Sequence, residues 1–371
     1  MRQLSGKWAT IFGIIAVLWC LFQLYTCIQG AFRPIIQRAT FVGFGLVMCF
    51  ALYPSSKKKA GQHRPEIRDS IFIAAGLVVV IYALVNEETF LTHVAMPIPR
   101  DLVMAVVAIA VLLEAGRRTL GYALPVIVIC GYLYGHFGPY LPGLFQHASL
   151  SWERMLDMTY RTDLGIWGAV TGIGATVIAA FIIFGAILFI TGAGDTFRNL
   201  ALKIAGRVRG GAAQTATVMS GLFGTLSGSA AANVATTGVF TIPMMKKLGY
   251  KPSFAGAVES CASSGGQLVP PIMGAGAFLM AEITGIPYLK ICLAAVIPAI
   301  LFYATLWIGI YFESRRVNLA PIPKELLPSW RDALAYNRSL PLFVPVGILL
   351  YLIISGHSLP LSCFWSLVSG L

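Results

Sequence analysis

The chain has 371 residues, of which 57% are hydrophobic and only 11% charged, and its mean hydropathy is +0.78. A soluble domain carries about 25% charged residues, so this chain lacks the polar side chains needed to cover a water-exposed surface. Its net charge of +12 lies in short segments between apolar runs, as orientation signals do in membrane proteins. These properties exclude a soluble enzyme and predict an all-α polytopic membrane protein, surrounded by lipid and without a nucleic-acid partner.

Apolar runs that, with their flanks, are long enough to cross a bilayer recur along the chain. A crossing takes about 20 helical residues, because backbone polar groups find no partner in lipid. The predicted spans, about nine in number, are 8–28, 40–53, 70–85, 102–113, 122–137, 164–191, 254–283, 291–312 and 340–354. The first run is longer than the apolar part of a secretory signal and no cleavage site follows it, so we expect it to be retained.

The cysteines and histidines give no sign of catalysis or metal binding. No two of the seven cysteines have CxxC spacing and most lie in apolar runs, which predicts buried free thiols. None of the five histidines adjoins a serine or cysteine in a nucleophile pattern. We therefore expect neither an enzyme nor an organic cofactor.

The basic residues predict how the chain is oriented. With a cytoplasmic N-terminus, most of the 27 lysines and arginines, including the lysines at 57–59, fall on the cytoplasmic side. This holds only if residues 212–245 enter and leave the membrane on the same side. A single crossing there would move Lys246, Lys247 and Lys251 outside and invert everything that follows. The charges therefore predict a re-entrant helical hairpin over 212–245.

The hairpin sequence SGLFGTLSGSAAANVATTG, residues 220–238, combines glycines, hydroxyls and an amide without any charge. Glycine is a poor helix former and serine competes for backbone hydrogen bonds, so we expect the helix to break across 224–229. Broken helices in transporters bind cations through oxygen atoms and point helix N-termini at anionic substrates. The candidate ligands are Ser227, Ser229, Asn233, Thr236 and Thr237, with Ser227, Ser229 and Asn233 assigned to Na⁺. The alternative is close helix packing through small residues.

A second unusual stretch is ESCASSGGQLVPPIMGAGA, residues 259–277. Gly265 and Gly266 followed by Pro270 and Pro271 predict an interrupted helix, because proline removes a donor and clashes with the preceding turn. This stretch again offers side-chain oxygen atoms, which belong to Ser260, Ser263, Ser264 and Gln267. Glu259 is an acid in an apolar context, which is a functional hypothesis by default. It can equally be a structural ion pair with Lys251, and both readings stay open.

These stretches resemble a known family. The runs GTLSGSAAANVATTGVFTIPMMKKLGYKPSFAGAVES and ASSGGQLVPPIMGAGAFLMAE are similar to the large-subunit signature of tripartite ATP-independent periplasmic (TRAP) transporters. The runs LEAGRRTLGYALPVIVICGYLYGHFGPYLPG and GRVRGGAAQTATVMSGL resemble the TAXI-type permeases, in which small and large subunits are fused. The resemblance implies a small-subunit-like four-helix region at 1–119 and the N-terminal part of a DctM-like large subunit at 120–371.

The resemblance also implies a mechanism. It implies an elevator-type permease of the bacterial inner membrane, driven by a sodium or proton gradient, which imports an organic anion, typically a carboxylate. A periplasmic TAXI-type solute-binding protein would deliver that anion. By motif, Ser227, Gly228, Ser229 and Asn233 correspond to the hairpin that helps form the ion and substrate site. Gly265, Gly266, Pro270 and Pro271 correspond to the interrupted helix beside it.

The sequence departs from the family in one respect. An inverted-repeat carrier needs two facing hairpins, whereas this chain has one SGS–N hairpin and one GGQ–PP break. We therefore expect the first half of an inverted-repeat transporter, with the second repeat missing and a second polypeptide as a further partner. The alternative is a truncated, transport-inactive membrane scaffold or assembly subunit.

Overall fold

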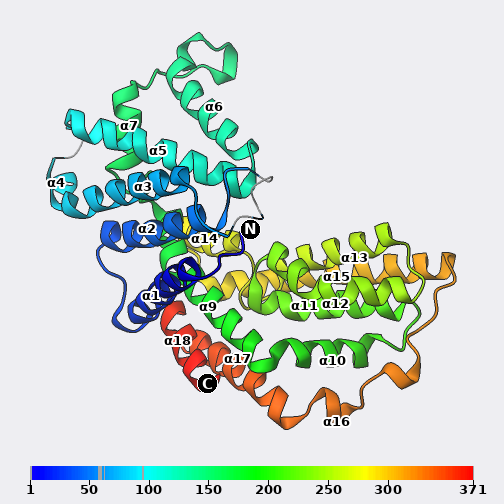
Figure 1. Cartoon of the computed structure of the whole chain (residues 1–371). Helices are drawn as coiled ribbons and strands as arrows, with labels where there is room; N and C mark the ends of the chain where they lie inside the picture. The colour runs from blue at the N-terminus through cyan, green and yellow to red at the C-terminus, as the bar shows by residue number, and fades with distance from the viewer. Residues whose placement is uncertain (1, 57–60, 62, 94–95, 371) are drawn as a thin grey trace. The chain divides into compact units, whose positions relative to one another are not determined.

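The fold is helical throughout the part of the chain that the structure covers. A computed structural model describes residues 2–56, 61, 63–93 and 96–370, and these residues form helices and loops without a strand (Figure 1). Five helical stretches are long and apolar enough to cross a membrane, namely Lys7–Gln29, Pro34–Leu52, Ile67–Val85, Ala169–Ala205 and Tyr288–Arg316. The prediction of an all-α membrane protein is confirmed. The lysines at 57–59 lie outside the described residues.

The chain divides into two compact units, Met1–Thr176 and Val177–Leu371. The first unit contains α1 (Lys7–Gln29), α2 (Pro34–Leu52), α3 (Ile67–Val85), α4 (Glu87–Thr92), α5 (Pro99–Leu120), α6 (Ala123–Phe137), α7 (Trp152–Tyr160) and α8 (Ala169–Ile173). Within it α2 packs on α3, α3 on α5 and α5 on α7. The boundary that the resemblance suggests, between residues 119 and 120, stays a prediction.

A buried ion-pair network ties the first unit together. The Asp69 carboxylate accepts hydrogen bonds from Arg2 at 2.9 Å and from Arg118 at 2.6 Å, and the three side chains are at most 1% exposed. Arg118 also binds Glu114 at 2.7 Å. Its guanidinium carbon lies 4.9 Å from the centre of the Phe50 ring. Because buried charges are tolerated only when paired, the network connects the N-terminal segment, α3 and the end of α5.

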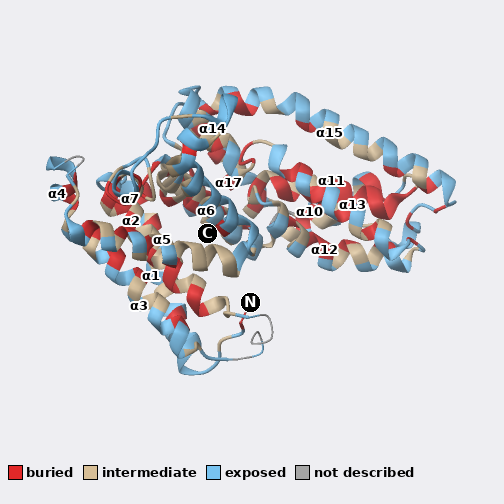
Figure 2. Cartoon of the chain, turned by 90° about the horizontal axis from the view of Figure 1, so that it is seen from above, coloured by how far each residue is buried: buried red, intermediate tan, exposed pale blue. Residues whose placement is uncertain are grey.

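The second unit is built around one helix. It contains α9 (Ala179–Leu188), α10 (Gly194–Ala205), α11 (Gly211–Ser227), α12 (Ala230–Lys247), α13 (Pro252–Gly265), α14 (Ala275–Thr284), α15 (Tyr288–Arg316), α16 (Trp330–Ala333), α17 (Tyr336–Ile354) and α18 (Leu359–Gly370). Helix α11 packs against α10, α12, α13 and α15, and most of its residues are buried, whereas α15 is largely exposed (Figure 2). The small residues of α11 allow its neighbours to approach closely.

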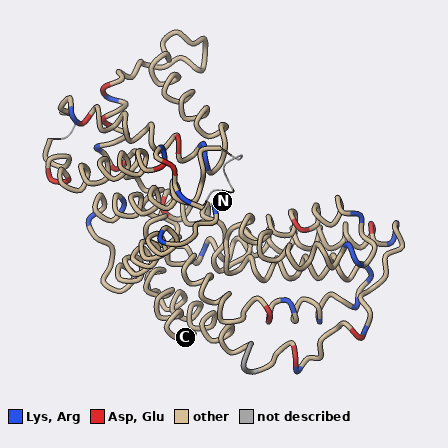
Figure 3. The backbone as a smooth tube through the Cα atoms, viewed as in Figure 1, with Lys and Arg blue, Asp and Glu red and all other residues tan. Residues whose placement is uncertain are grey.

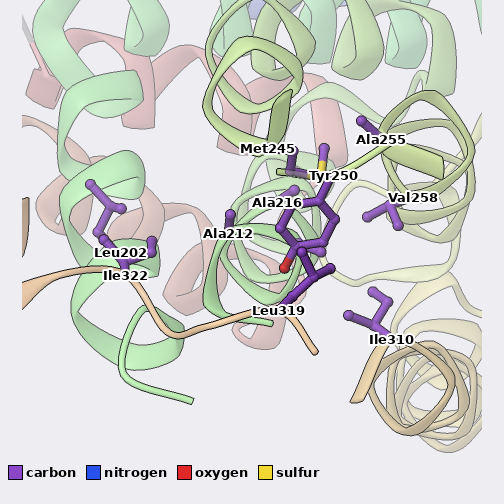
Figure 4. Packing of buried hydrophobic residues seen from close by; sticks show 11 residues of the cluster. Leu202, Ala212, Ala216, Met245, Tyr250, Ala255, Val258, Ile310, Leu319 and Ile322 are labelled. Carbon is purple, nitrogen blue, oxygen red and sulfur yellow. The ribbon is translucent and has the colours of Figure 1, made fainter. Parts of the chain in front are cut away.

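An apolar cluster packs the end of α11 that begins at Gly211 (Figure 4). Ala212 and Ala216 of α11 lie among side chains that come from six other segments, namely Leu202, Met245, Tyr250, Ala255, Val258, Ile310, Leu319 and Ile322. Burial raises the pKa of Tyr250, which follows α12, so its hydroxyl stays protonated at neutral pH. This cluster holds α10, α12, α13 and α15 around α11.

Two predicted spans differ from the observed helices. The run 254–283 forms two helices, α13 and α14, with a short 3₁₀ turn and a non-helical segment between them. This confirms the interruption predicted from the paired glycines and prolines. The run 164–191 becomes helical only at Ala169 and continues to Ala205 through π-helical turns at Gly174–Ile178 and Phe189–Ala193. A kink at Gly192, where φ is 105°, marks the second turn.

Candidate functional site

The predicted hairpin exists as two helices joined by two residues. Helix α11 ends at Ser227, Gly228 takes the left-handed conformation with φ 58°, and Ser229 caps α12 by accepting a hydrogen bond from the Ala232 N–H at 3.3 Å. The break is therefore shorter than predicted. We expected the helix to end across 224–229, but Gly224 lies within α11, because burial and tertiary packing outweigh its low helix propensity.

The interrupted helix supplies the other half of the site. After α13, a short 3₁₀ turn (Gly266–Leu268) leads into a non-helical segment that contains Pro270 and Pro271. The Tyr288 hydroxyl on α15 lies 2.7 Å from the carbonyl oxygens of both Pro271 and Ile272 and can donate to either. The carbonyls that leave the helix are thus partly satisfied by a buried side chain, as a non-helical segment among membrane helices requires.

The hairpin and the interruption touch through their backbones. A β-carbon placed on Gly228 would lie 2.0 Å from the Met273 carbonyl oxygen. One placed on Gly224 would lie 2.3 Å from the α-carbon of Gly266. Such approaches are open only to glycine. The two sequence segments that we singled out separately therefore form one junction.

Asn233 connects the two arms of the hairpin. Its side chain is fully buried, and its Nδ2 donates to the Ser220 carbonyl oxygen on α11 at 2.8 Å. Its Oδ1 lies 3.2 Å from the Thr237 hydroxyl, whose single hydrogen also has the Asn233 carbonyl oxygen, at 2.8 Å, and Glu259 Oε1 as acceptors. The need of a buried amide for partners is met inside the protein, and the amide holds α12 against α11.

The two serines at the hairpin tip differ. Ser229 is exposed and its hydroxyl caps α12. The Ser227 oxygen is buried and has no hydrogen-bond partner within the part of the chain that the structure describes. A buried hydroxyl without a partner costs roughly 1–3 kcal/mol, so Ser227 carries an unused oxygen beside the junction.

Glu259 lies fully buried between the hairpin and α13. Its Oε1 accepts hydrogen bonds from Thr237, from Ser263 at 3.3 Å and from Ser220 at 3.4 Å. Its Oε2 accepts one from Thr241. Within the described residues no ion pair joins Glu259 to Lys251, which is exposed. The structure therefore shows a buried acid that is held by hydroxyls and is not paired with Lys251.

Comparison with known proteins identifies the family. The family model described as "Tripartite ATP-independent periplasmic transporter, DctM component" matches residues 106–369, which is more than half of the chain. The chain belongs to this family.

Individual relatives of this TRAP permease support the assignment. It is 31% identical over 153 residues to the C4-dicarboxylate TRAP transporter large permease protein of Pseudomonas aeruginosa, covering 41% of this chain and 35% of the relative. It is 26% identical over 200 residues to the 2,3-diketo-L-gulonate TRAP transporter large permease protein of Escherichia coli (52% and 46%). The sialic acid TRAP transporter large permease protein of Vibrio cholerae is 25% identical over 201 residues (52% and 47%). The chain spans less than half the length of each of these relatives, all of which are transport proteins.

Not all of the predicted site residues of this TRAP permease lie at the junction. The residues at the junction or beside it are Ser227, Gly228, Asn233, Thr237, Gly265, Gly266, Pro270 and Pro271. The other three take no part in the buried hydrogen bonds there. Ser229 caps its helix, Thr236 donates to the Ala232 carbonyl oxygen at 2.8 Å, and the Gln267 side chain is exposed.

Ser220 and Thr241 were not singled out from the sequence, whereas Ser263 was named there as a source of oxygen and Glu259 as a functional hypothesis. The sequence does carry a signal for the hydroxyls, because Thr237 and Thr241 are one helical turn apart, as are Glu259 and Ser263. Glu259 stands out because the two hairpin helices beside it carry almost no charge. Helix α11 has no charged residue and α12 has only Lys246 and Lys247 in its last turn, so both tubes are tan along most of their length (Figure 3).

Proposed function

We propose that this chain is the permease component of a TAXI-type TRAP transporter in the bacterial inner membrane. It imports an organic anion, typically a carboxylate, and uses a sodium or proton gradient as the driving force. A periplasmic TAXI-type solute-binding protein delivers the anion. Residues 1–119 act as the small-subunit-like region and residues 120–371 belong to the large-subunit part. Membership of the DctM family and the names of the relatives support this proposal.

The observation that carries the proposal is the junction between the hairpin tip and the interrupted helix. Gly228 closes on the Met273 carbonyl, and the buried Ser227 oxygen beside it lacks a partner among the residues that the structure describes. Oxygen atoms at a helix break are the ligands that transporters use for Na⁺. We assign Na⁺ to Ser227, Ser229 and Asn233, and Thr237 supports Asn233. The N-terminus of α12, whose dipole favours negative charge, is assigned to the anion.

Transport in proteoliposomes tests this function. The vesicles would contain the purified chain together with a polypeptide that carries the second repeat, with the binding protein added outside and radiolabelled succinate (a C4-dicarboxylate) or sialic acid as probes. We expect uptake of an organic anion that requires both the binding protein and an inward cation gradient. Uptake that is independent of both would contradict the proposal, and so would a folded chain that transports no organic anion under any gradient.

Ser229→Ala and Asn233→Ala test the site within the same assay. We expect both variants to lose gradient-driven uptake, because Ser229 and Asn233 are assigned to the cation. Ser264→Ala is the matched control, since its exposed hydroxyl bonds to the carbonyl oxygen of Ser260 in its own helix at 2.8 Å. Unchanged uptake in both Ser229→Ala and Asn233→Ala would favour the alternative that the small residues serve helix packing.

A further inference from the structure

The Glu259 carboxyl has an environment that no ordinary buried ion pair explains. Its contacts come from four hydroxyls on three helices: Ser220 of α11, Thr237 and Thr241 of α12, and Ser263 of α13. We call these four hydroxyls and the carboxyl the Glu259 ring. An ionised group inside a membrane protein is expensive and is normally paired or functional. The Glu259 ring contains acceptors and donors but no cation.

The neighbouring helices do not supply the missing positive charge. Helix α11 has no charged residue, and the lysines of α12, Lys246 and Lys247, are exposed in its last turn. On α13 the remaining titratable group is Cys261, which is exposed. On α15 the Tyr303 hydroxyl donates to the Ala262 carbonyl oxygen at 2.8 Å. Within the described chain, nothing that faces the carboxyl neutralises it.

The Glu259 ring can form hydrogen bonds with the carboxyl in both its ionised and its protonated state. Thr241 has one hydroxyl hydrogen but two acceptors within reach, the Thr237 carbonyl oxygen at 3.0 Å and Oε2 of Glu259. With the carboxylate ionised, this hydrogen points to Oε2. When a proton binds to Oε2, the new O–H donates to the Thr241 oxygen, and the Thr241 hydrogen turns to the Thr237 carbonyl. One hydroxyl rotation therefore exchanges the two states without breaking the ring.

The two threonine hydroxyls of the ring bond to the carboxyl directly. A metal ion held between the carboxyl and these hydroxyls would have to part both hydrogen bonds, whereas a proton adds no volume. Because hydrogen-bonded contact already connects the oxygens, the geometry suits a proton.

We propose that Glu259 is the proton-binding group of this permease, and that it takes up a proton from one side of the membrane and releases it to the other during transport. This inference rests on the proposed function and deepens it. The co-reactant is the proton of the transmembrane gradient, which neutralises the carboxylate when it binds. Sodium at the hairpin tip and a proton at Glu259 are then separate sites.

The position of the ring explains how proton binding reaches the hairpin. Thr237 contacts both Glu259 and Oδ1 of Asn233, and Asn233 in turn holds the Ser220 carbonyl of α11. The β-carbon position of Gly266 lies 2.8 Å from Asn233 Nδ2. A change in the donors around Glu259 therefore acts on the contact between the hairpin and the interrupted helix.

Infrared difference spectroscopy after a pH change tests the proton site without substrate or binding protein. We expect the full chain in lipid nanodiscs to show a protonated carboxyl C=O stretching band that is absent in Glu259→Gln. Glu282→Gln is the matched control, because Glu282 is exposed on α14. Its band pattern should equal that of the unaltered chain. A band that persists in Glu259→Gln, or no carboxyl band at any pH at which the chain is folded, overturns the proposal.

A second variant keeps the test independent of the folding of Glu259→Gln. Thr241→Val removes the hydroxyl that serves both states and should shift the frequency of the same band, since the protonated carboxyl loses its acceptor. An unshifted band would contradict the ring mechanism. Stabilisation by NaCl relative to choline chloride should survive in Glu259→Gln, and its loss would make Glu259 a metal ligand instead.

Transport separates this inference from the proposed function. We expect proton-driven uptake in proteoliposomes to be lost in Glu259→Gln and kept in Glu282→Gln. Proton-driven uptake by Glu259→Gln would refute proton coupling at Glu259 and leave the permease function standing. No uptake by the unaltered chain, with the carboxyl band present, would count against the proposed function but not against proton binding at Glu259.

Discussion

Gly228 and Met273 meet across the junction of the hairpin with the interrupted helix, and no side chain fits between them. A β-carbon on Gly228 would lie 2.0 Å from the Met273 carbonyl oxygen, and the φ of Gly228 is 58°. Both the space and the backbone conformation therefore demand glycine. These two residues join segments that are more than forty positions apart in the sequence.

Gly228→Ala should destabilise the chain and weaken the site. The left-handed backbone alone costs about 1–2 kcal/mol for a residue with a β-carbon, and the clash with Met273 adds to this. We expect a lower thermal unfolding temperature in detergent and loss of gradient-driven uptake. Gly256→Ala is the control, because its added methyl group meets nothing within 4 Å and it lies inside α13. Equal stability of the two variants would show that the junction does not form.

Ser227→Ala should separate stability from cation binding. In the described part of the chain the buried Ser227 oxygen has no partner, a situation that costs roughly 1–3 kcal/mol. Its removal should therefore leave the unfolding free energy unchanged or raise it. The stabilisation of the purified chain by NaCl over choline chloride should disappear. If this sodium effect is as large in Ser227→Ala as in the unaltered chain, Ser227 is not a ligand.

Asn233→Ala should lower stability as well as uptake. It removes the 2.8 Å hydrogen bond to the Ser220 carbonyl and the contact with Thr237, and it leaves a buried gap between α11 and α12. Loss of a buried hydrogen-bonded group costs about 1–3 kcal/mol. Denaturant or thermal unfolding measures this effect. A variant as stable as the unaltered chain would argue that Asn233 does not hold the hairpin arms together.

Asp69→Asn should destabilise the first unit strongly. It leaves Arg2 and Arg118 buried without their shared carboxylate, and breaking a buried ion pair costs about 3–5 kcal/mol. Thermal unfolding should shift to a lower temperature. Arg316→Gln, which breaks an exposed pair with Glu313, should have no measurable effect. Similar unfolding temperatures for the two variants would contradict the importance of the buried network.

Site-directed labelling should place residues 57 and 246 on the same face of the membrane. Lys57→Cys and Lys246→Cys, each made after serine replaces the exposed Cys20, Cys130 and Cys261, would react with an impermeant maleimide from the cytoplasmic side only. Arg33→Cys is the opposite-face control. Reaction of the introduced cysteines at 57 and 246 from opposite faces would rule out a re-entrant hairpin.

The sequence by itself determined the local features of this protein. Apolar runs predicted helices because lipid offers no partner for an unpaired backbone. The interruption was predicted from Gly265, Gly266, Pro270 and Pro271, because such residues disturb a helix within one turn of their own position. The hairpin was predicted from the basic residues on both sides of it. Family motifs pointed to the permease family, which the family model confirms.

Only the tertiary structure decided which oxygens meet. Hydrogen bonds between helices depend on how each helix is rotated about its axis, and this is set by packing on neighbours far away in the sequence. Packing around α11 therefore turned Thr237 and Thr241 toward Glu259, while Thr236 bonds to its own helix. The same packing kept Gly224 helical against its propensity and left the Ser227 hydroxyl without a partner within the described ranges. Composition pointed to the two segments, and helix rotation decided which of their side chains meet.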